Sequence, residues 1–590
     1  MASLVAYLDR SSTPDDRRAE AMLRAVDHRG SARRTGVVGR CTLGVSGEDA
    51  TDPLATLAVE DGWGAVVAGA IDNVEELARA LHLEGPQTPA RIALALVRAR
   101  GAEAVRELRG PFSVAVTDGR GLWAARDHLG FRSLFFRAEP ARLLVATDAV
   151  QVLAGAGLSP EPDLEVVEVI YFGEYDHGTP CALRGVSRLA KAELVSFADG
   201  GIERRRYWRP EELLETAEGD EDELGERFDA AMTQAASRAL TGSDAISLSG
   251  GIDSPTVAAF AAPLHRERFG RALPALSVVY PDLPSVDERP YIEEVAAMLG
   301  LSLRTYEETA REFDGIEEVM GIMSEPVPRY FVAEAAEHYR RARALGYRSL
   351  LTGELVEWVA SRKDFFPSHL LLHGRWGALR RHLAAQRARG VRWRWLIREL
   401  AASFEAPVIQ RWRALHGRAR VPVPPWIDEG RFRRVEAHHV VPARRRWLDL
   451  QVALFRGVGI PEQAQDALQD WCGVRVRPLF GDVDVCEFFV SLPAERKFPE
   501  TRRKGFIVRR MRGRVPDSIL DRERKTVFND AVLRRADYDA MKRFLVAPEI
   551  RLRGIDYETL ADRLEAGAMD IVELEYAKNL AAIHAFLARW

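Results

Sequence analysis

The sequence predicts a mixed α/β protein with two unlike domains, and three observations lead to this expectation. Residues 1–210 consist mostly of short runs in which apolar and polar residues alternate, which is typical of strands that are half buried. From residue 244 onward, short apolar runs alternate with longer helical patterns, as in a parallel sheet with crossover helices. A strongly acidic stretch at 211–226 separates the two patterns. We therefore expect a first domain over 1–210 and a second over 211–590.

In the first domain, the predicted strands are "WGAVVAGAI", "FSVAVTD", "GLWAARD" and "RLLVATD", each of which ends near Gly, Asp or Pro. Helical patterns cover 74–82 and 90–108. This arrangement predicts a mostly β, layered α/β domain.

In the second domain, the acidic stretch begins a helix that leads to the first strand, "AISLS". The strands "ALSVVY" and "SLLTG" follow, with helices predicted at 290–300 and 331–346. This order predicts a doubly wound parallel sheet, and the chain becomes mainly helical toward its C-terminus.

Composition restricts the class of protein. The 590 residues carry a formal charge of -4, from 83 basic and 87 acidic side chains, so overall charge favours neither a nucleic acid nor a membrane as partner. The cysteines lack the close spacing of metal or redox sites; they are Cys41, Cys181, Cys472 and Cys486. The first residues do not resemble a signal peptide, and we expect a soluble, cytoplasmic protein.

The stretch "SLSGGIDSP" lies between the strand at 245–249 and a predicted helix. Ligands bind where parallel strands end and helices begin, and free N–H groups there favour anions. Gly250 and Gly251 allow the backbone to approach a phosphate, Ser249 and Ser254 offer hydroxyls, and Asp253 offers a ligand for a hard cation. The group therefore predicts a pyrophosphate site with its metal, although a turn followed by a helix cap is the simpler alternative.

Four segments in this order resemble the asparagine synthetase-like amide ligases of the ATP-pyrophosphatase, or PP-loop, type. "SGGIDS" matches the signature SGGxDS of that family, and three later segments are similar to other family motifs: "LLTGELVE", "GVRVRPLFGD" and "RERKTVFND". The resemblance extends over nearly the whole chain. It implies a PP-loop synthetase domain that uses ATP and Mg²⁺.

The resemblance also implies roles for individual residues in binding ATP and metal. Leu248, Val278 and the backbone of Thr352 and Gly353 fall at positions that recognise adenosine. Asp253 would bind Mg²⁺, together with Glu357, which stands where the family usually has aspartate.

Two further residues would act in the chemistry. Glu354 falls where asparagine synthetases have glutamate and β-lactam synthetases have tyrosine, and it would contact the adenylated intermediate or the attacking amine. Lys525 would place positive charge beside the reacting phosphorus. Arg524 and Lys504 are the alternative sources of that charge.

Residues 66–81 and 110–136 resemble the glutamine amidotransferase domain, of N-terminal-nucleophile type, that precedes the synthetase in asparagine synthetases. Asn73 matches an oxyanion-hole asparagine of that domain, but Ala2 stands where the nucleophilic cysteine is expected. Without a thiolate, the domain is expected to be degenerate and to produce no ammonia. The attacking amine would then belong to the substrate.

Family members with such degenerate domains are the β-lactam synthetases, the carbapenam synthetases and the lasso peptide cyclases. Glu354, the chain length and a variable helical insert at 360–448 favour a lasso peptide cyclase, which is a macrolactam synthetase. The resemblance then implies a precursor peptide as substrate, and a leader peptidase and a leader-recognition protein as partners. The alternatives are ring closure on a small amino-acid substrate and a non-catalytic peptide-binding pseudo-synthetase.

The insert is rich in arginine and tryptophan, as in "HGRWGALRRHL" and "GVRWRWLIREL". Such interleaving can indicate nucleic-acid binding, but we expect a helical lid with Trp inward and Arg outward that contributes to a peptide pocket. His438 and His439 are adjacent and point apart, so we expect them to be structural rather than metal ligands.

Overall fold

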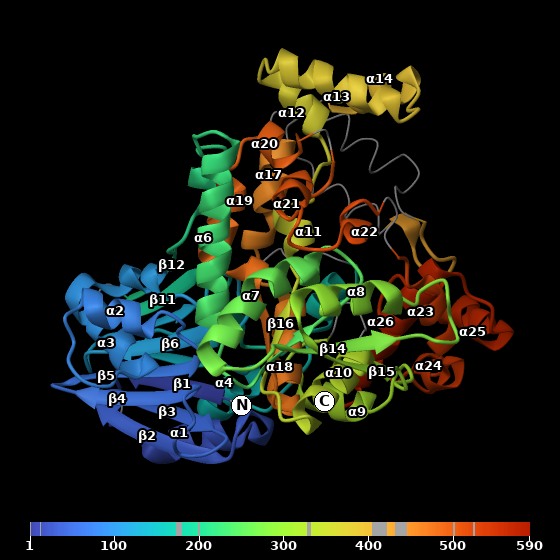
Figure 1. Cartoon of the computed structure of the whole chain (residues 1–590). Coiled ribbons are helices and arrows are strands. Elements are labelled where there is room, and N and C mark those ends of the chain that lie inside the picture. The colour runs from blue at the N-terminus through green and yellow to red at the C-terminus, as the bar shows by residue number, and fades with distance from the viewer. Residues whose placement is uncertain are drawn as a thin grey trace.

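The computed structural model describes residues 2–11, 13–172, 180–198, 201–326, 332–403, 422–430, 445–499, 502–522 and 526–590. The first domain is built on two six-stranded sheets, seen at the blue end of the chain in Figure 1. One sheet has the order β10-β8-β9-β1-β3-β2 and the other β12-β11-β7-β6-β5-β4. The strands are β1 (Ala2–Asp9), β2 (Ala32–Val38), β3 (Cys41–Gly47), β4 (Ala55–Glu60), β5 (Trp63–Gly69), β6 (Phe112–Thr117), β7 (Leu122–Arg126), β8 (Phe135–Glu139), β9 (Arg142–Ala146), β10 (Ser187–Arg188), β11 (Glu193–Ala198) and β12 (Gly201–Arg206).

The two sheets stack because alternate residues of their strands are apolar. Leu4 and Leu43 from one sheet share a buried cluster with Val66 and Ala115 from the other. On the outer face of the second sheet, α3 packs through buried residues such as Leu96. The helices of this domain are α1 (Asp16–Arg24), α2 (Val74–Ala80), α3 (Pro89–Arg100), α4 (Ala149–Ala156) and α5 (Leu164–Phe172). The predicted layered α/β domain is confirmed.

The second domain contains a five-stranded parallel sheet with the order β15-β14-β13-β16-β17. Its strands are β13 (Asp244–Ser247), β14 (Pro274–Val279), β15 (Ser302–Glu307), β16 (Ser349–Thr352) and β17 (Arg475–Pro478). From central β13 the chain proceeds to β14 on one side, whereas β16 lies on the other side. The strand order therefore reverses at the carboxyl ends of β13 and β16, and open α/β sheets bind their ligands in the crevice at such a point. The predicted doubly wound sheet is confirmed.

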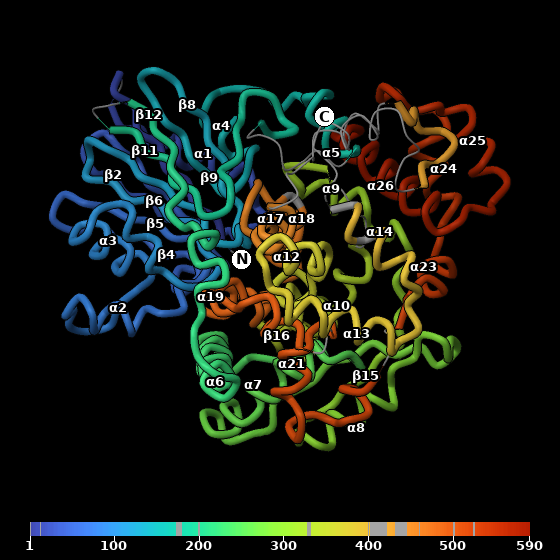
Figure 2. The backbone as a smooth tube through the Cα atoms, turned by 90° about the horizontal axis from the view of Figure 1, so that it is seen from above, coloured from blue at the N-terminus to red at the C-terminus, as the bar shows by residue number. Residues whose placement is uncertain are grey.

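Helices cover this sheet and form the C-terminal part of the chain (Figures 1 and 2). They are α6 (Glu221–Ala239), α7 (Asp253–Phe269), α8 (Arg289–Leu299), α9 (Ile316–Ile322), α10 (Val332–Ala344), α11 (Val356–Val359), α12 (Phe366–Leu372), α13 (Trp376–Ala388), α14 (Trp393–Ser403), α17 (Arg446–Val452), α18 (Ile460–Cys472), α19 (Val483–Ser491), α20 (Ala494–Lys497), α21 (Gly505–Arg510), α22 (Asp517–Leu520), α23 (Asn529–Arg535), α24 (Tyr538–Leu545), α25 (Tyr557–Ala566) and α26 (Ile571–Leu587).

The acidic stretch at 211–226, which begins the second domain, is only partly helical. α6 begins at Glu221, with Asp220 and Glu223 forming a capping box at its N-terminus. The helix therefore starts about ten residues later than the start of the acidic stretch, because Asp220 supplies the first strong cap.

A buried ionic cluster joins the two domains. Arg29 of the first domain lies 3.0 Å from Asp466 and 2.8 Å from Asp470, both on α18. Arg132 also contacts both carboxylates. Burial opposes ionisation of Asp470, but Arg132 and the neighbouring Arg475 hold its pKa below the ordinary value. Paired charges of this kind fix the position of α18 against the first domain.

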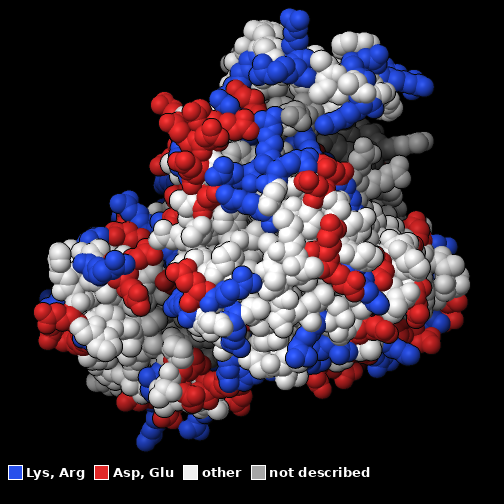
Figure 3. Space-filling view, in the orientation of Figure 1, with Lys and Arg blue, Asp and Glu red and all other residues white. Residues whose placement is uncertain are grey.

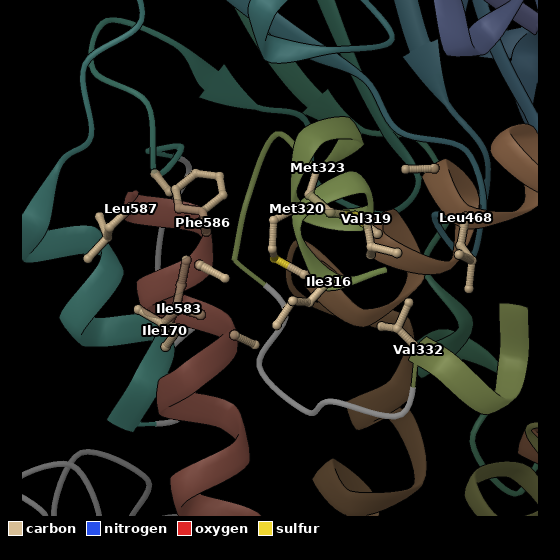
Figure 4. Packing of buried hydrophobic residues seen from close by; sticks show 14 of the residues in the cluster. Ile170, Ile316, Val319, Met320, Met323, Val332, Leu468, Ile583, Phe586 and Leu587 are labelled. Atoms are coloured by element: carbon tan, nitrogen blue, oxygen red, sulfur yellow. The ribbon is translucent and has the colours of Figure 1, made fainter. Parts of the chain in front are cut away.

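An apolar cluster extends this contact to the end of the chain. Ile583, Phe586 and Leu587 of α26 lie near Ile170 of α5 and Met320 of α9, as Figure 4 shows. Helices from both domains thus share one core. Across the described residues, no helix combines the length and the apolar character that crossing a bilayer would require.

The insert departs from the expected lid. Trp376, Trp393 and Trp395 are 64%, 53% and 52% exposed, so these tryptophans do not point inward as predicted. Leu379 of α13 and Phe366 of α12 supply the buried contacts of this part of the insert, together with Trp447 near the end of the insert, which is buried. Figure 1 shows α13 and α14 projecting beyond the rest of the molecule. His438 and His439 lie outside the described residues.

Candidate functional site

The "SGGIDS" segment forms the loop that connects β13 to α7, at the carboxyl end of the central strand. The N–H of Ser249 donates to Oγ of Ser254 (2.9 Å), and the two hydroxyl oxygens lie 3.0 Å apart. These contacts fold the loop back onto the first turn of α7. The free N–H groups at the start of this 17-residue helix favour an anion.

Gly353 brings the end of β16 against the same helix start. A Cβ atom at Gly353 would lie 2.6 Å from the carbonyl carbon of Asp253 and from the nitrogen of Ser254. Any larger residue would push the two segments apart. Gly250 is similarly restricted, because a Cβ there would meet Glu288 at 2.8 Å. The two glycine-containing motifs are therefore brought together by close backbone packing.

The residues predicted to recognise adenosine lie along the edge of this crevice. Leu248 is buried directly after β13, and its N–H donates to the carbonyl of Leu276 (3.1 Å). Val278 is half-buried in β14, the strand that pairs with β13. Thr352 ends β16, and its buried hydroxyl has no hydrogen-bond partner among the described residues. An unsatisfied hydroxyl here is available to a ligand.

The two predicted metal carboxylates converge on one lysine. Nζ of Lys504 lies 2.7 and 2.8 Å from the two carboxylate oxygens of Asp253 and 2.7 Å from Oε1 of Glu357. Asp253 begins α7 and Glu357 lies in α11, so the loop and the "GELVE" segment meet at this ammonium. Glu357, which stands where the family usually has aspartate, therefore reaches the same ammonium as Asp253. No group of three or more possible metal ligands occurs among the described residues. Asp253 and Glu357 supply two carboxylates, the type of ligand that a hard cation takes.

The sequence analysis names Lys504 only as an alternative source of the positive charge assigned to Lys525. Its backbone adopts φ +54°, a conformation in which non-glycine residues are uncommon, immediately before α21. The pair Lys504–Gly505 at the start of a helical pattern was the available signal.

Glu288 and Arg522 hold the loop from its other side, and sequence reasoning did not identify either residue. Oε2 of Glu288 accepts from the N–H of Gly250 (3.0 Å), and Oε1 accepts from Arg522 (2.9 Å) and from the hydroxyl of Thr526 (2.7 Å). Arg522 also donates to the carbonyl of Gly250 (3.1 Å). Arg522 therefore contacts the loop directly and Thr526 contacts it through Glu288, while Lys525 and Arg524, which lie between them, are outside the described residues.

Glu354 lies in the same segment as Glu357, but its contacts are different. Nε2 of Gln465, on α18, donates to Oε2 of Glu354 and to the hydroxyl of Tyr339, both at 3.3 Å. Gln465 belongs to the helix that carries Asp466 and Asp470 of the interdomain ionic cluster. The position of Glu354 is thus connected through α18 to the first domain.

The first domain lacks a thiol that could act as a nucleophile. Ala2 is fully buried, and its N–H donates to Oδ1 of Asp470 (3.2 Å) while its carbonyl accepts from Arg132. Cys41 pairs with Leu8, at the opposite end of β1, and burial raises its pKa to about 12. All four cysteines are buried and unpaired, and burial raises the pKa of each thiol.

Asn73, which matches an oxyanion-hole residue, is engaged in local structure. Its side-chain nitrogen donates to the carbonyl of Glu107 (2.9 Å), and its side-chain oxygen accepts from the N–H of Arg109 (2.9 Å). Both ends of the amide are therefore used to hold the loop before β6.

Comparisons with known proteins agree with this geometry. Residues 227–564 match the family model of asparagine synthase, and residues 1–208 match that of the glutamine amidotransferase domain. Asparagine synthetase [glutamine-hydrolyzing] 3 of Bacillus subtilis is 26% identical over 273 residues, which cover 43% of this chain and 44% of that protein. Amidase chyE of Penicillium rubens is 27% identical over 307 residues, covering 48% and 44%. Each match thus spans less than half of the relative's length.

Two solved structures also match at low identity. Glutamine phosphoribosylpyrophosphate amidotransferase from B. subtilis is 12% identical, with a TM-score of 0.26, over 59% of this chain and 80% of that one. A glutamine aminotransferase class-II domain protein from Silicibacter pomeroyi is 15% identical, with a TM-score of 0.20, over 35% and 100%. The asparagine synthase model covers more than half of the chain, including the loop after β13 and the segment of Glu354 and Glu357. The chain therefore belongs to the asparagine synthase family, with an N-terminal domain of the glutamine amidotransferase type.

Proposed function

We propose that this protein is an ATP-dependent, AMP-forming carbon–nitrogen ligase that closes the macrolactam ring of a lasso peptide. A side-chain carboxylate of Asp or Glu in the precursor peptide would attack the α-phosphorus of ATP and release pyrophosphate. The N-terminal amine of the same peptide would then attack the acyl-adenylate. An isopeptide bond forms, AMP leaves, and the amine loses a proton.

The observation that carries this proposal is the absence of an activated thiol from a domain of the amidotransferase type. Ala2 is held by backbone hydrogen bonds at the start of β1, and the thiol of Cys41 is buried at the far end of that strand. Without a thiolate, glutamine cannot be hydrolysed by the mechanism of such domains. The amine must then come from the substrate, which favours intramolecular ring closure.

The residues at the crevice fit ATP and Mg²⁺. Asp253 and Glu357 approach one cation, the Lys504 ammonium, from two elements, so the same oxygens would hold Mg²⁺. Bound there, Mg²⁺ would neutralise phosphate charge. The backbone around Gly250 and Gly251 would accommodate the phosphates, and Leu248, Val278, Thr352 and Gly353 would contact the adenosine.

The remaining groups would act on the peptide. Glu354, held by Gln465, would orient the attacking amine or accept its proton. Lys525 would stabilise charge that develops on the adenylate in the transition state. Holding the two ends of one peptide together is the largest expected contribution, because it makes the attack intramolecular. A leader peptidase and a leader-recognition protein would deliver the freed N-terminus.

The test is pyrophosphate release from purified protein with ATP, Mg²⁺ and one candidate peptide at a time. A productive peptide should lose one water in mass and become resistant to carboxypeptidase. The same peptide with an acetylated N-terminus should still release pyrophosphate at first but form no ring. Ring closure at an unchanged rate with the acetylated peptide, or amide formation only when ammonia is added, would exclude this function.

A further inference from the structure

The projecting helices α13 and α14 combine exposed tryptophans with a cluster of arginines. Residues 375–398 contain eight arginines and no aspartate or glutamate. Figure 3 shows these basic side chains over the part of the molecule that stands out beyond the remainder. Trp376 and Trp393 are more than half exposed. Burying such residues against a partner is favourable, whereas leaving them in water is not.

An open groove of about 660 Å³ runs along α13 and ends at Trp393, the first residue of α14. Its apolar lining comprises Trp376, Leu379, Leu383 and Trp393, and Arg380 and Arg387 flank it. Leu379 is buried against α12, so the floor of the groove is firmly attached to the domain. The volume is in the range of pockets that bind a ligand larger than one side chain.

Helices α13 and α14 form a helical hairpin, and Arg375 at its base shows which groups pair with the arginines of this segment. The guanidinium of Arg375 is bound by both oxygens of Glu215 (2.9 and 2.8 Å) and by Glu495 (2.6 Å). Beyond Arg375, neither Arg380 nor Arg387 has an ion pair within the described part of the chain. Carboxylates therefore pair with Arg375 at the base of the hairpin, whereas Arg380 and Arg387 in the groove have no carboxylate partner among the described residues.

Shape and ring contacts decide which anionic partner fits. Lipid bilayers present a flat surface, which matches a convex apolar face better than a groove. For single-stranded nucleic acid, open indole faces are needed for stacking. Here the guanidinium of Arg387 lies 5.4 Å from the Trp393 ring, and Arg394 and Arg398 each lie 5.7 Å from that of Trp395. An acidic peptide can place an apolar side chain against the lining of the groove and carboxylates against the arginines that flank it.

We infer that the α13–α14 groove binds an acidic segment of the polypeptide substrate, with a large apolar side chain between Trp376 and Trp393 and carboxylates on Arg380 and Arg387. This inference rests on the proposed peptide ligase function and adds the location and chemistry of substrate docking. Figure 1 shows the hairpin projecting beyond α21, and Figure 2 shows α13 beside α21 when the molecule is seen from above. A peptide held there can therefore extend toward the crevice that contains Lys504.

The experiment selects random-sequence displayed peptides for binding to the full-length protein without ATP. The variant pair is Arg380→Glu/Arg387→Glu in the groove and Arg381→Glu/Arg389→Glu as the control, which makes the same charge change on the same stretch of chain outside the lining. Wild-type protein should enrich peptides rich in Asp and Glu with an aromatic or aliphatic residue. Their affinity should fall at least about tenfold in the groove variant and less than about threefold in the control.

Enrichment of neutral or basic sequences, or none that depends on Arg380 and Arg387, would overturn the inference. So would tighter binding of phosphatidylserine vesicles or single-stranded DNA through these residues. The selection needs no turnover, so it distinguishes failure of docking from failure of the proposed reaction. If a peptide is cyclised, the groove variant should raise KM at least about tenfold and change kcat less than about twofold.

Discussion

Nζ of Lys504 lies between Asp253 and Glu357, at 2.7 Å from an oxygen of each carboxylate. The three residues come from the starts of α7, α11 and α21, which are far apart in sequence. One ammonium therefore occupies the place where two carboxylates would share a divalent cation. A lysine in that place both neutralises the pair and competes with Mg²⁺ for it.

Lys504→Met should bind Mg²⁺ more tightly than the wild type. Without the ammonium, the two carboxylates repel each other and gain more from a divalent cation. We expect the dissociation constant for Mg²⁺ alone, measured by calorimetry, to fall at least about tenfold. Lys504→Arg keeps the positive charge and should bind Mg²⁺ about as the wild type does. An unchanged constant in the methionine variant would mean that Mg²⁺ binds elsewhere.

Asp253→Asn should abolish adenylation with little loss of fold. The change removes the charge of the carboxylate at the start of α7, which would bind Mg²⁺, and leaves the apolar core intact. Pyrophosphate release should fall at least about hundredfold, while the circular dichroism spectrum stays the same. Asp517→Asn, on an exposed carboxylate bonded to Arg512, is the matched control and should retain full activity. Normal turnover by Asp253→Asn would show that the metal site is misplaced.

Lys525→Ala should slow ring closure by about 10²- to 10³-fold while ATP still binds. Its ammonium would act on charge that appears only in the transition state, so ground-state binding is spared. Single-turnover ring closure and ATP affinity give the two readouts. If Arg524→Ala loses activity and Lys525→Ala does not, the register of "RERKTVF" is shifted by one. If neither loses activity, Lys504 becomes the candidate for that charge.

Local sequence predicted the turn from strand to helix where backbone geometry decides it. Gly250 and Gly353 stand out in their motifs, and the structure shows that close packing at both positions leaves no room for a side chain. Glu288 could not be predicted, because a glutamate at the start of a helix looks the same whether or not it reaches a distant loop. Its contact with Gly250 depends on how β14 and α8 fold back along the sheet.

The prediction that Trp376, Trp393 and Trp395 point inward was wrong for a related reason. A helical pattern indicates which residues share a face, and burial of the tryptophan face was the reasonable expectation. The structure instead buries Leu379 and leaves Trp376 and Trp393 in the groove. Which face of α13 packs is decided by α12, which no local pattern reveals.

Glutamine should not support amide formation by this protein. Cys41 pairs with the end of β1, and its pKa of about 12 leaves almost no thiolate at neutral pH. We expect Cys41→Ala to close the ring at the wild-type rate and to release the same background amount of glutamate from glutamine as the wild type. Liberation of glutamate from glutamine in step with turnover would contradict this and restore an amidotransferase role to the first domain.

Lys497 should make the protein more stable as pH rises above neutral. Its ammonium is buried, with a hydrogen bond to Gln451 (2.9 Å), and burial lowers its pKa from 10.5 to about 7, although Glu215 opposes the shift. Between about pH 7 and 10.5, the unfolded chain therefore binds a proton that the folded chain lacks. The free energy of unfolding should rise through this window by up to about 1.4 kcal/mol per pH unit, and below pH 7 this group should contribute no further slope.

Lys497→Met isolates this contribution, because the remaining groups titrate alike in both proteins. Urea unfolding at pH 7 and pH 9 should show a smaller gain for the variant than for the wild type, and the variant should be the more stable of the two at pH 7. Methionine keeps the apolar stem beside the Trp447 ring, which lies 6.0 Å from Nζ, and removes the buried charge. Equal pH dependence in the two proteins would show that Lys497 stays charged in the folded state, with Glu215 as the carboxylate that keeps it so.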